Sequence, residues 1–255
     1  MIKVSSISTT KAESKPTTYV LAGQTVVFDQ PVAALEAYAA SLDVQKSTQL
    51  IGSLQTPEAT SDLVYRGPAP IDGRLREVSV WRTEVGVQID VDTQAICQLH
   101  FQHMAIQLLD TQGLNSRVNL EVITGPAIIL LLQRQGIYCL HAGAIQSRAG
   151  TIALIAESGA GKSTLSTHLA DDWRQISDDL LPVTLSVSES ETGVSLLPAY
   201  PQLKLPRASV PDLPASALPL DYVVRINPQP TPKFECHRLS PQNAMLQLIR
   251  HTVAA

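Results

Sequence analysis

Residues 151–164 read Thr-Ile-Ala-Leu-Ile-Ala-Glu-Ser-Gly-Ala-Gly-Lys-Ser-Thr. The apolar run at 151–155 predicts a buried strand, and the glycine-rich stretch after it predicts a tight turn that leads into a helix. Gly159 and Gly161 allow successive backbone N–H groups to point at one anion, and a helix that begins near Lys162 adds the positive end of its dipole. A strand, a glycine-rich turn and a helix in this order are typical of a phosphate-binding loop.

The loop follows the pattern G-x-x-x-x-G-K-[ST] except at its first position, where Ala156 replaces the glycine. A methyl group is tolerated there if the residue keeps a negative φ. In this pattern the ammonium of Lys162 reaches the β- and γ-phosphates of a nucleotide, and the hydroxyl of Ser163 suits Mg²⁺. The alternative is an ordinary strand–turn–helix with an incidental lysine. The residues that we expect to bind the nucleotide are Ser158, Gly159, Ala160, Gly161, Lys162, Ser163 and Thr164.

A pair of carboxylates, Asp178 and Asp179, ends the short strand predicted over 175–177, which follows the helix after the loop. Ligands of α/β sheets bind at the carboxyl ends of the strands, so we expect this pair beside the loop. One carboxylate can hold Mg²⁺ while the other accepts a proton from an attacking hydroxyl. A solvated turn is the alternative, and it is the interpretation that we prefer for Asp171 and Asp172.

His141 lies on the strand predicted over 137–145, which a tight turn connects to the strand that enters the loop. Small residues at 142–144 follow it and leave space around the imidazole ring. Two interpretations suit this position: a hydrogen-bonded core histidine, or a histidine in contact with Asp178 or with a metal-bound water.

The composition excludes several classes of protein. The net charge of −4 and the absence of a basic cluster argue against a nucleic-acid partner. The cysteines, Cys97, Cys139 and Cys236, are widely spaced and form no metal-ligand pattern, so reduced thiols are expected. The N-terminus has no signal-peptide core, and the longest apolar run, 127–132, is too short to span a bilayer. We therefore expect a cytoplasmic protein with no membrane partner.

The chain before Gly136 is rich in predicted strands. Residues 18–28 predict two strands with a turn between them, and residues 62–104 predict a run of strands. A helix is predicted over 31–42, where a proline stands near the first turn. Residues 118–133 predict an extended segment followed by a short apolar helix.

The chain after the acidic pair predicts fewer regular elements. Strand character continues to residue 187, and a polar turn is expected over 188–194. The proline-rich stretch 197–220 predicts irregular or edge structure. A strand is expected over 222–226, and Ser240 begins a C-terminal helix with an apolar face.

Three stretches taken together resemble the catalytic domain of HPr kinase/phosphorylase: Leu140–Ile145, Ile155–Thr164 and Ile176–Leu180. Their order and spacing also match. The chain is more closely similar to the HPr-kinase-like proteins of bacterial peptide-modification clusters, which include lasso-peptide kinases, and the segment Pro198–Leu205 is similar to a further segment of those relatives. The catalytic resemblance covers residues 137–205, and more loosely 125–255.

The resemblance implies an α/β fold, a mixed sheet with a P-loop like that of the HPr kinase C-terminal domain and phosphoenolpyruvate carboxykinase. It implies a β-rich N-terminal region over 1–124, which binds an acceptor or a partner, and a catalytic domain over 125–255. The cofactors that it implies are ATP and Mg²⁺. The roles that it implies are these: phosphate binding by Lys162 and the loop backbone, Mg²⁺ binding by Ser163 and Asp179, general-base action by Asp178, and support of that carboxylate or of the metal site by His141.

The chain departs from the HPr enzymes at several points. Thr164 stands where they carry an acidic residue, and the glycine-rich, glutamate-containing segment that follows their aspartates has no match here. The missing segment argues against HPr itself as the substrate and against strong phosphorylase activity. The relatives continue beyond the C-terminal helix, so a truncated form is also among the expectations.

The leading hypothesis is therefore a kinase that transfers the γ-phosphate of ATP to a hydroxyl, Ser or Thr of a peptide or small protein. A kinase of small-molecule, amino-acid-like hydroxyls is one alternative. A non-catalytic nucleotide-binding switch or scaffold is another, suggested by Ala156. The resembled family is often oligomeric, so a second copy of the chain is also an expected partner.

Overall fold

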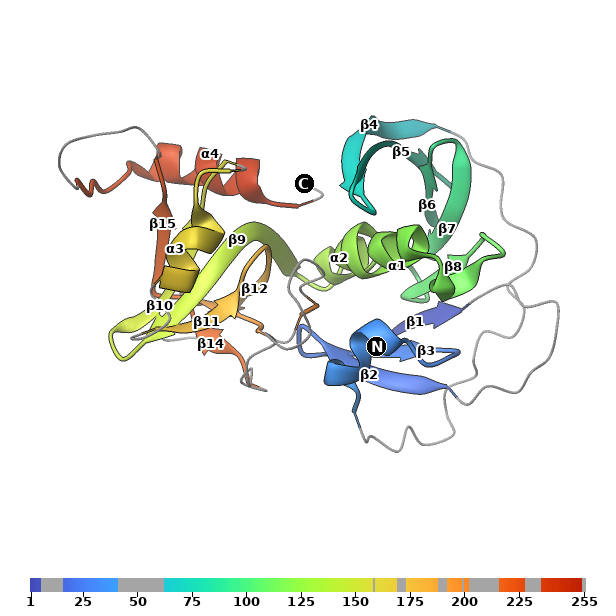
Figure 1. Cartoon of the computed structure of the whole chain (residues 1–255), viewed down its shortest axis with the longest axis horizontal. Coiled ribbons are helices and arrows are strands. Elements are labelled where there is room, and N and C mark those ends of the chain that lie inside the picture. The colour runs from blue at the N-terminus through green and yellow to red at the C-terminus, as the bar shows by residue number, and fades with distance from the viewer. Residues whose placement is uncertain are drawn as a thin grey trace. The chain divides into compact units, whose positions relative to one another are not determined.

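The computed structural model describes residues 1–5, 16–40, 62–157, 159–168, 173–187, 192–198, 200–201, 216–227 and 235–253. These residues form a mixed α/β protein with two mixed sheets and a few helices, as predicted (Figure 1). The chain divides into two compact units, Met1–Gln135 and Gly136–Ala255. Residues 125–135, which the resemblance assigns to the catalytic region, therefore belong to the first unit. Among the described residues, none of the helices has both the length and the apolar character needed to span a bilayer.

The first unit contains an eight-stranded sheet in the order β2-β3-β1-β8-β7-β6-β5-β4. Strand β1 runs parallel to both of its neighbours, and the other pairs are antiparallel. The two strands expected within 18–28 and the run of strands expected over 62–104 are confirmed. The strands are β1 (Ile2–Ser5), β2 (Thr17–Leu21), β3 (Gln24–Phe28), β4 (Leu63–Ile71), β5 (Arg74–Arg82), β6 (Gly86–Val91), β7 (Gln94–His100) and β8 (Ala105–Leu108).

The helix predicted over 31–42 is wrong in type. Ala33–Tyr38 forms a 3-10 helix (η1) instead, and residues 41 and 42 lie outside the described residues. After Tyr38 the chain returns to β2, where Ala39 forms a bridge with Tyr19 and the N–H of Ala40 donates to the carbonyl of Thr18. This pairing takes the backbone groups that a longer helix would need.

The extended segment predicted at the start of 118–133 is also wrong, because the stretch is helical except for a kink at Gly125. It follows a short 3-10 helix (η2, Gly113–Asn115) and comprises α1 (Arg117–Val122), η3 (Ile123–Ala127) and α2 (Ile128–Gln133). The hydroxyl of Ser116 caps α1 by accepting from the N–H of Asn119 at 3.4 Å. Val118, Leu120 and Val122 alternate with Asn119 and Glu121, a period of two that is typical of a strand, which explains the error.

The second unit is built around β9 (Ile137–Ser147), the long central strand of the other sheet. Its order is β14-β13-β12-β9-β10-β15, with β11 paired to β9 on the same edge as β12. Only the β10–β15 pair is parallel among the described strands of this sheet. The other elements are β10 (Gly150–Ile155), α3 (Lys162–His168), β11 (Arg174–Ser177), β12 (Leu180–Val187), β13 (Thr192–Leu196), β14 (Leu218–Pro219), β15 (Tyr222–Arg225) and α4 (Pro241–His251).

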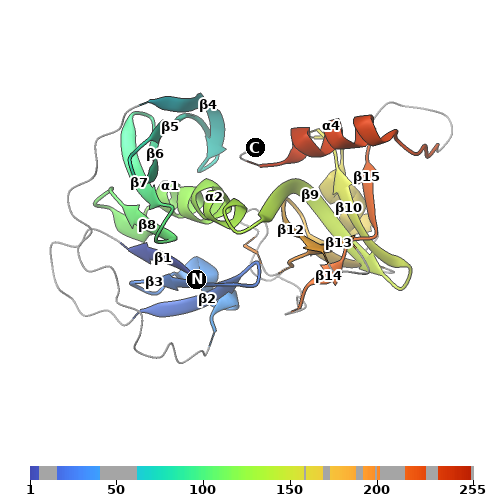
Figure 2. The same cartoon turned by 180° about the vertical axis from the view of Figure 1, so that it is seen from behind.

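Strand β13, seen in Figure 2, begins inside the stretch 188–194, for which the sequence predicts a turn. Its residues pair antiparallel with β12, from Val187 opposite Thr192 to Val183 opposite Leu196. Tertiary pairing therefore overrides the polar composition of that stretch. Of the proline-rich stretch 197–220, residues 199 and 202–215 lie outside the described residues.

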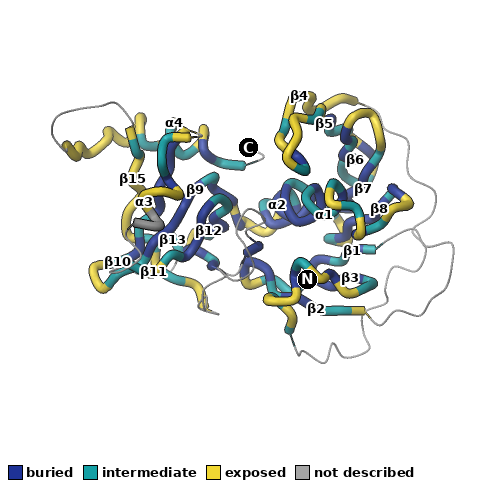
Figure 3. Tube along the Cα trace, viewed as in Figure 1, coloured by how far each residue is buried: buried dark blue, intermediate teal, exposed yellow. Residues whose placement is uncertain are grey.

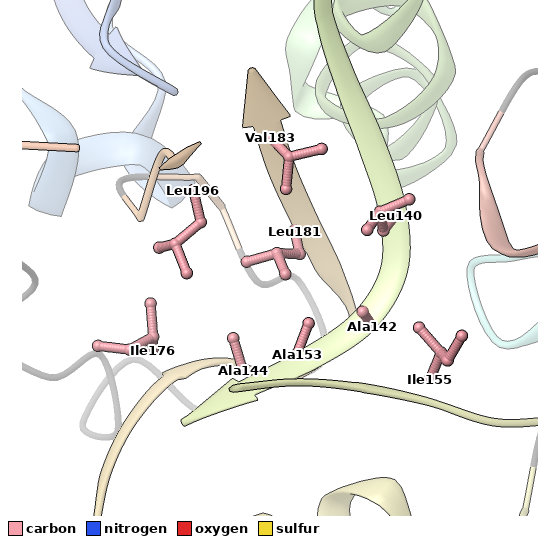
Figure 4. Close-up of a cluster of buried hydrophobic side chains, with 9 residues drawn as sticks. All are labelled: Leu140, Ala142, Ala144, Ala153, Ile155, Ile176, Leu181, Val183 and Leu196. Carbon is pink, nitrogen blue, oxygen red and sulfur yellow. The ribbon is translucent and has the colours of Figure 1, made fainter. Parts of the chain in front are cut away.

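Alternate residues of β9 face the core of the second unit. This cluster combines small and large side chains, which Figure 4 shows, and buried residues dominate β9 and β12 in Figure 3. Because side chains alternate along a strand, His141 and Gly143 belong to the opposite face of the sheet. The cluster consists of Leu140, Ala142, Ala144, Ala153, Ile155, Ile176, Leu181, Val183 and Leu196.

Helix α4 begins at the predicted place. The hydroxyl of Ser240 caps it by accepting from the N–H of Asn243 at 3.3 Å. Leu248 packs against the core cluster, whereas Met245 and Ile249 are 57% and 55% exposed. The apolar face of α4 is therefore only partly buried by the described residues of the unit.

Candidate functional site

Strand β9 aligns the ends of β10 and β11. Both run antiparallel to β9, β10 along one edge and β11 along the other. Ile155, the last residue of β10, lies opposite Ala142, and Ser177, the last residue of β11, lies opposite Ala144. The N–H of Ala142 also donates to the carbonyl of Asp179 at 3.1 Å. The residues that follow β10 and those that follow β11 therefore lie at nearly the same level, on either side of β9.

The glycine-rich loop, residues 156–161, follows β10. Gly159 and Gly161 have φ values of +80° and +93°, which L residues rarely adopt. A Cβ at either position would meet no atom within 4 Å, so the requirement for glycine is one of backbone conformation and not of space. Ser158, a predicted nucleotide ligand, lies outside the described residues.

Lys162 closes the loop on itself. Its ammonium donates to the carbonyl of Ala156 at 2.8 Å, and the side chain is buried. Ala156 does not have a positive φ, so it meets the condition under which its methyl group is tolerated. The N–H of Ala160 donates to the carbonyl of Glu157 at 3.1 Å, and that of Leu165 donates to Gly161 at 2.8 Å.

Ser163 and Thr164 lie at the start of α3 and are exposed. The predicted helix over 163–170 is confirmed as far as His168, and the two residues beyond it are not described. The hydroxyl groups of Ser163 and Thr164 are therefore carried on the element that directly follows the loop.

Asp178 and Asp179 connect β11 to β12, both of which pair with β9. The hydroxyl oxygen of Ser177 lies 2.9 Å from the carbonyl oxygen of Leu180 and holds the turn closed. Asp178 is only 9% exposed, which argues against a freely solvated turn. Asp171 and Asp172, the pair expected to be solvated, lie outside the described residues.

His141 contacts the second of the two carboxylates. Its Nε2 lies 3.0 Å from Oδ1 of Asp179, and the two side chains are 43% and 23% exposed. The pair is thus partly accessible to a ligand. From the sequence, a contact with Asp178 and a place in a metal site are both open to this histidine, and the structure joins the ring to Asp179, the carboxylate predicted to bind Mg²⁺.

The C-terminal residues also reach this part of the sheet, which sequence reasoning missed. Thr252 forms an antiparallel bridge with Leu140, and the N–H of Val253 donates to the carbonyl of Cys139 at 2.8 Å. These residues pair with the edge of β9 that β10 leaves free beyond Ala142. The local sequence, a histidine at a helix end followed by Thr and Val, gives no signal of this long-range contact.

Cys139 lies on β9 near these residues and is unsuited to nucleophilic chemistry. Burial raises the pKa of its thiol to about 12, so the reactive thiolate is scarce near neutral pH. The described residues 1–5, 16–40 and 62–157, together with the described parts of 159–253, contain no cluster of three or more His, Cys, Asp or Glu that could hold a metal by themselves.

The chain matches no protein-family model, and none of the curated proteins matches it.

Proposed function

We propose that the second unit is an ATP- and Mg²⁺-dependent phosphotransferase of the HPr-kinase-like type, which transfers the γ-phosphate to a hydroxyl. The observation that carries this proposal is the alignment on β9. It brings the glycine-rich loop after β10 and the carboxylates after β11 to the same level of one sheet. A donor site for phosphate and a site for the attacking hydroxyl must meet in this way for in-line transfer.

The loop forms the donor half of the proposed site. Left-handed glycines at 159 and 161 support a turn whose N–H groups can converge on phosphate oxygens. Lys162 already stands within reach of the loop, because its ammonium bonds the carbonyl of Ala156. In the proposal, when ATP is bound, the ammonium of Lys162 donates to a phosphate oxygen instead of to the carbonyl of Ala156, so the buried ammonium gains a charged acceptor.

The carboxylates form the acceptor half. The oxygen of the attacking hydroxyl bonds to the γ-phosphorus while Asp178 accepts the proton of that hydroxyl. ADP leaves with the electrons of the broken P–O bond. Burial of Asp178 at the end of β11 supports a fixed position for this carboxylate. His141 positions Asp179 through their 3.0 Å contact.

Mg²⁺ fits the residues only in combination with the nucleotide. Ser163 and Asp179 would hold it together with phosphate oxygens, and the ion would neutralise charge on the transferred group. Mg²⁺ commonly uses one or two carboxylates plus phosphates and keeps several waters, so the lack of a larger acidic cluster among the described residues suits this ion.

The resemblance of Leu140–Ile145, Ile155–Thr164 and Ile176–Leu180 supports a fold for the second unit like that of phosphoenolpyruvate carboxykinase. It also supports a cytoplasmic, oligomeric enzyme whose acceptor is Ser or Thr of a peptide or small protein. The first unit, with its eight-stranded sheet, is the part that we propose to bind the acceptor or a partner.

Transfer of label from γ-labelled ATP tests the proposal. The purified chain is incubated with Mg²⁺, arrayed Ser/Thr peptides and a panel of free hydroxyl compounds. Lys162→Ala should abolish both binding and transfer, whereas Asp178→Asn should still bind ATP and lose transfer. Glu235→Gln, an exposed carboxylate outside the site, is the matched control and should behave like the wild type.

The outcome separates the alternatives. Label on free hydroxyl compounds alone indicates a small-molecule kinase. ATP binding without transfer to any acceptor, with Asp178→Asn equal to the wild type, indicates a nucleotide-binding switch. Near-normal transfer by Asp178→Asn overturns the assignment of the general base.

A further inference from the structure

His251, the last residue of α4, is fixed at the edge of β9. The bridge between Thr252 and Leu140 and the hydrogen bond from the N–H of Val253 to the carbonyl of Cys139 set an antiparallel register. In that register residue 251 lies at the level of His141. β10 pairs with one edge of β9 as far as Ala142, and the chain then turns away into the glycine-rich loop. The C-terminal end of α4 lies along the continuation of that edge, next to Leu140.

The imidazole of His251 has an incomplete set of hydrogen bonds. The residue is 7% exposed, and its Nε2 is inaccessible to solvent and has no hydrogen-bond partner among the described residues. Buried polar atoms are nearly always paired, and an unpaired one is destabilising. Residue 251 follows Ile155 along the same edge of β9, and Ile155 is the residue from which the chain enters the glycine-rich loop. An unpaired buried nitrogen at this place suits a ligand that supplies the missing partner.

The surroundings of His251 identify the charge of that ligand. Burial lowers the pKa of its imidazole, Glu157 raises it, and His141, Lys162 and Arg225 lower it further. Charged groups of the loop, β9, α3 and β15 therefore act electrostatically on the ring. Lys162 and Arg225 are permanent cations, and Arg225 lies opposite Ile155, the last residue of β10. The left-handed glycines at 159 and 161 allow the N–H groups of the loop to converge on an anion.

We propose that His251 is a phosphate-binding residue, whose Nε2–H donates to a phosphate oxygen of the nucleoside triphosphate taken by the glycine-rich loop. The proposal rests on the proposed function and extends it, because it assigns a part of the nucleotide site to the C-terminal helix. Nothing in the loop pattern includes this residue, which stands far beyond Lys162 in the sequence.

Lys162 and His251 offer two buried nitrogen donors near the start of the loop. The ammonium of Lys162 donates to the carbonyl of Ala156 in this structure, and Nε2 of His251 has no partner among the described residues. In the proposal both nitrogens donate to phosphate oxygens of the bound triphosphate.

Isothermal titration of the full chain with ATP and Mg²⁺ tests the proposal. His251→Leu keeps the bulk of the ring and removes the donor, and it should weaken ATP binding about tenfold or more, as expected for a hydrogen bond to a charged group. His251→Gln places an amide N–H near the position of Nε2 and should recover most of the affinity. His237→Leu is the matched control, because His237 is an exposed histidine whose ring pairs with Glu235, and it should not change the affinity.

NMR of wild-type protein with labelled histidine keeps the test independent of whether His251→Leu folds. Tripolyphosphate alone should shift the imidazole signal of His251, and adenosine alone should leave it unchanged. A shift with adenosine and none with tripolyphosphate overturns phosphate binding by this ring.

The results distinguish the two proposals. If the wild type binds ATP, Lys162→Ala weakens that binding, and folded His251→Leu equals the wild type, only the role of His251 fails. If the wild type binds neither ATP nor tripolyphosphate, the proposed function fails and the role of His251 fails with it.

Discussion

Replacing Gly161 with alanine isolates the contribution of backbone conformation to the glycine-rich loop. A Cβ at this position would meet no atom within 4 Å, so steric conflict with neighbouring residues adds nothing. The φ of +93° remains, and it lies outside the region that L residues adopt easily. Holding an alanine there costs about 1–3 kcal/mol.

That cost converts into a change in nucleotide affinity. If the loop must keep this φ to bind phosphate, about 1–3 kcal/mol weakens ATP binding roughly 5- to 160-fold. The melting temperature should change little, because a surface loop can relax without loss of the core. Isothermal titration with ATP and Mg²⁺, combined with a thermal melt of each variant, measures both quantities.

Gly73→Ala is the matched control. Gly73 also has a positive φ, +68°, and a Cβ there would likewise meet no atom within 4 Å, yet it belongs to the turn between β4 and β5 in the first unit. It should carry a comparable backbone cost and leave ATP binding unchanged. Unaltered ATP binding by Gly161→Ala, or equal losses in both variants, would refute the link between the left-handed loop and phosphate binding.

Three further predictions concern the ion pair, the core and the thiols. Asp179→Asn should lower the rate of phosphate transfer and raise the Mg²⁺ concentration that transfer requires, and wild-type Mg²⁺ dependence would contradict the assignment. The free energy of unfolding, measured by urea titration, should change by less than about 1 kcal/mol, because the pair with His141 is partly exposed. Leu181→Ala should lower the free energy of unfolding by about 2–5 kcal/mol in a urea titration, because Leu181 is fully buried in the core cluster, and a loss below about 1 kcal/mol would show that the cluster collapses around the gap. Burial raises the pKa of Cys139 to about 12, so its thiol stays protonated at pH 8 and forms thiolate only toward pH 12. A thiol reagent at pH 8 should therefore label exposed Cys236 and leave Cys139 unlabelled until the protein unfolds. Rapid labelling of Cys139 in the folded chain would contradict its burial.

The local elements near the site could be predicted because short-range patterns specify them. The apolar run before Ala156 indicated β10, and the glycines at 159 and 161 marked positions where the backbone needs positive φ. Ser240 followed by proline marked the start of α4. Each of these signals depends on neighbouring residues alone, through capping, strand propensity or backbone freedom.

The errors arose where tertiary pairing competes with local preference. The stretch 31–42 has a helical pattern, yet its end pairs with β2 and only a 3-10 helix forms. The start of 118–133 alternates apolar and polar residues as a strand does, yet it is helical, and the hydroxyl of Ser116 caps the helix that begins there. β13 forms in a polar stretch because β12 supplies its hydrogen-bond partners.

The sequence by itself determined the loop, the acidic pair and the strands that carry them, since these depend on residues close together in the chain. Only the tertiary structure decided that β10 and β11 end at the same level on opposite edges of β9, that His141 contacts Asp179, and that His251 lies at the level of His141. The physical reason is that strand register is set by the pairing of backbone groups and by which face is buried. Those choices are made between segments far apart in the chain, as with Leu140 and Thr252, and no local propensity encodes them.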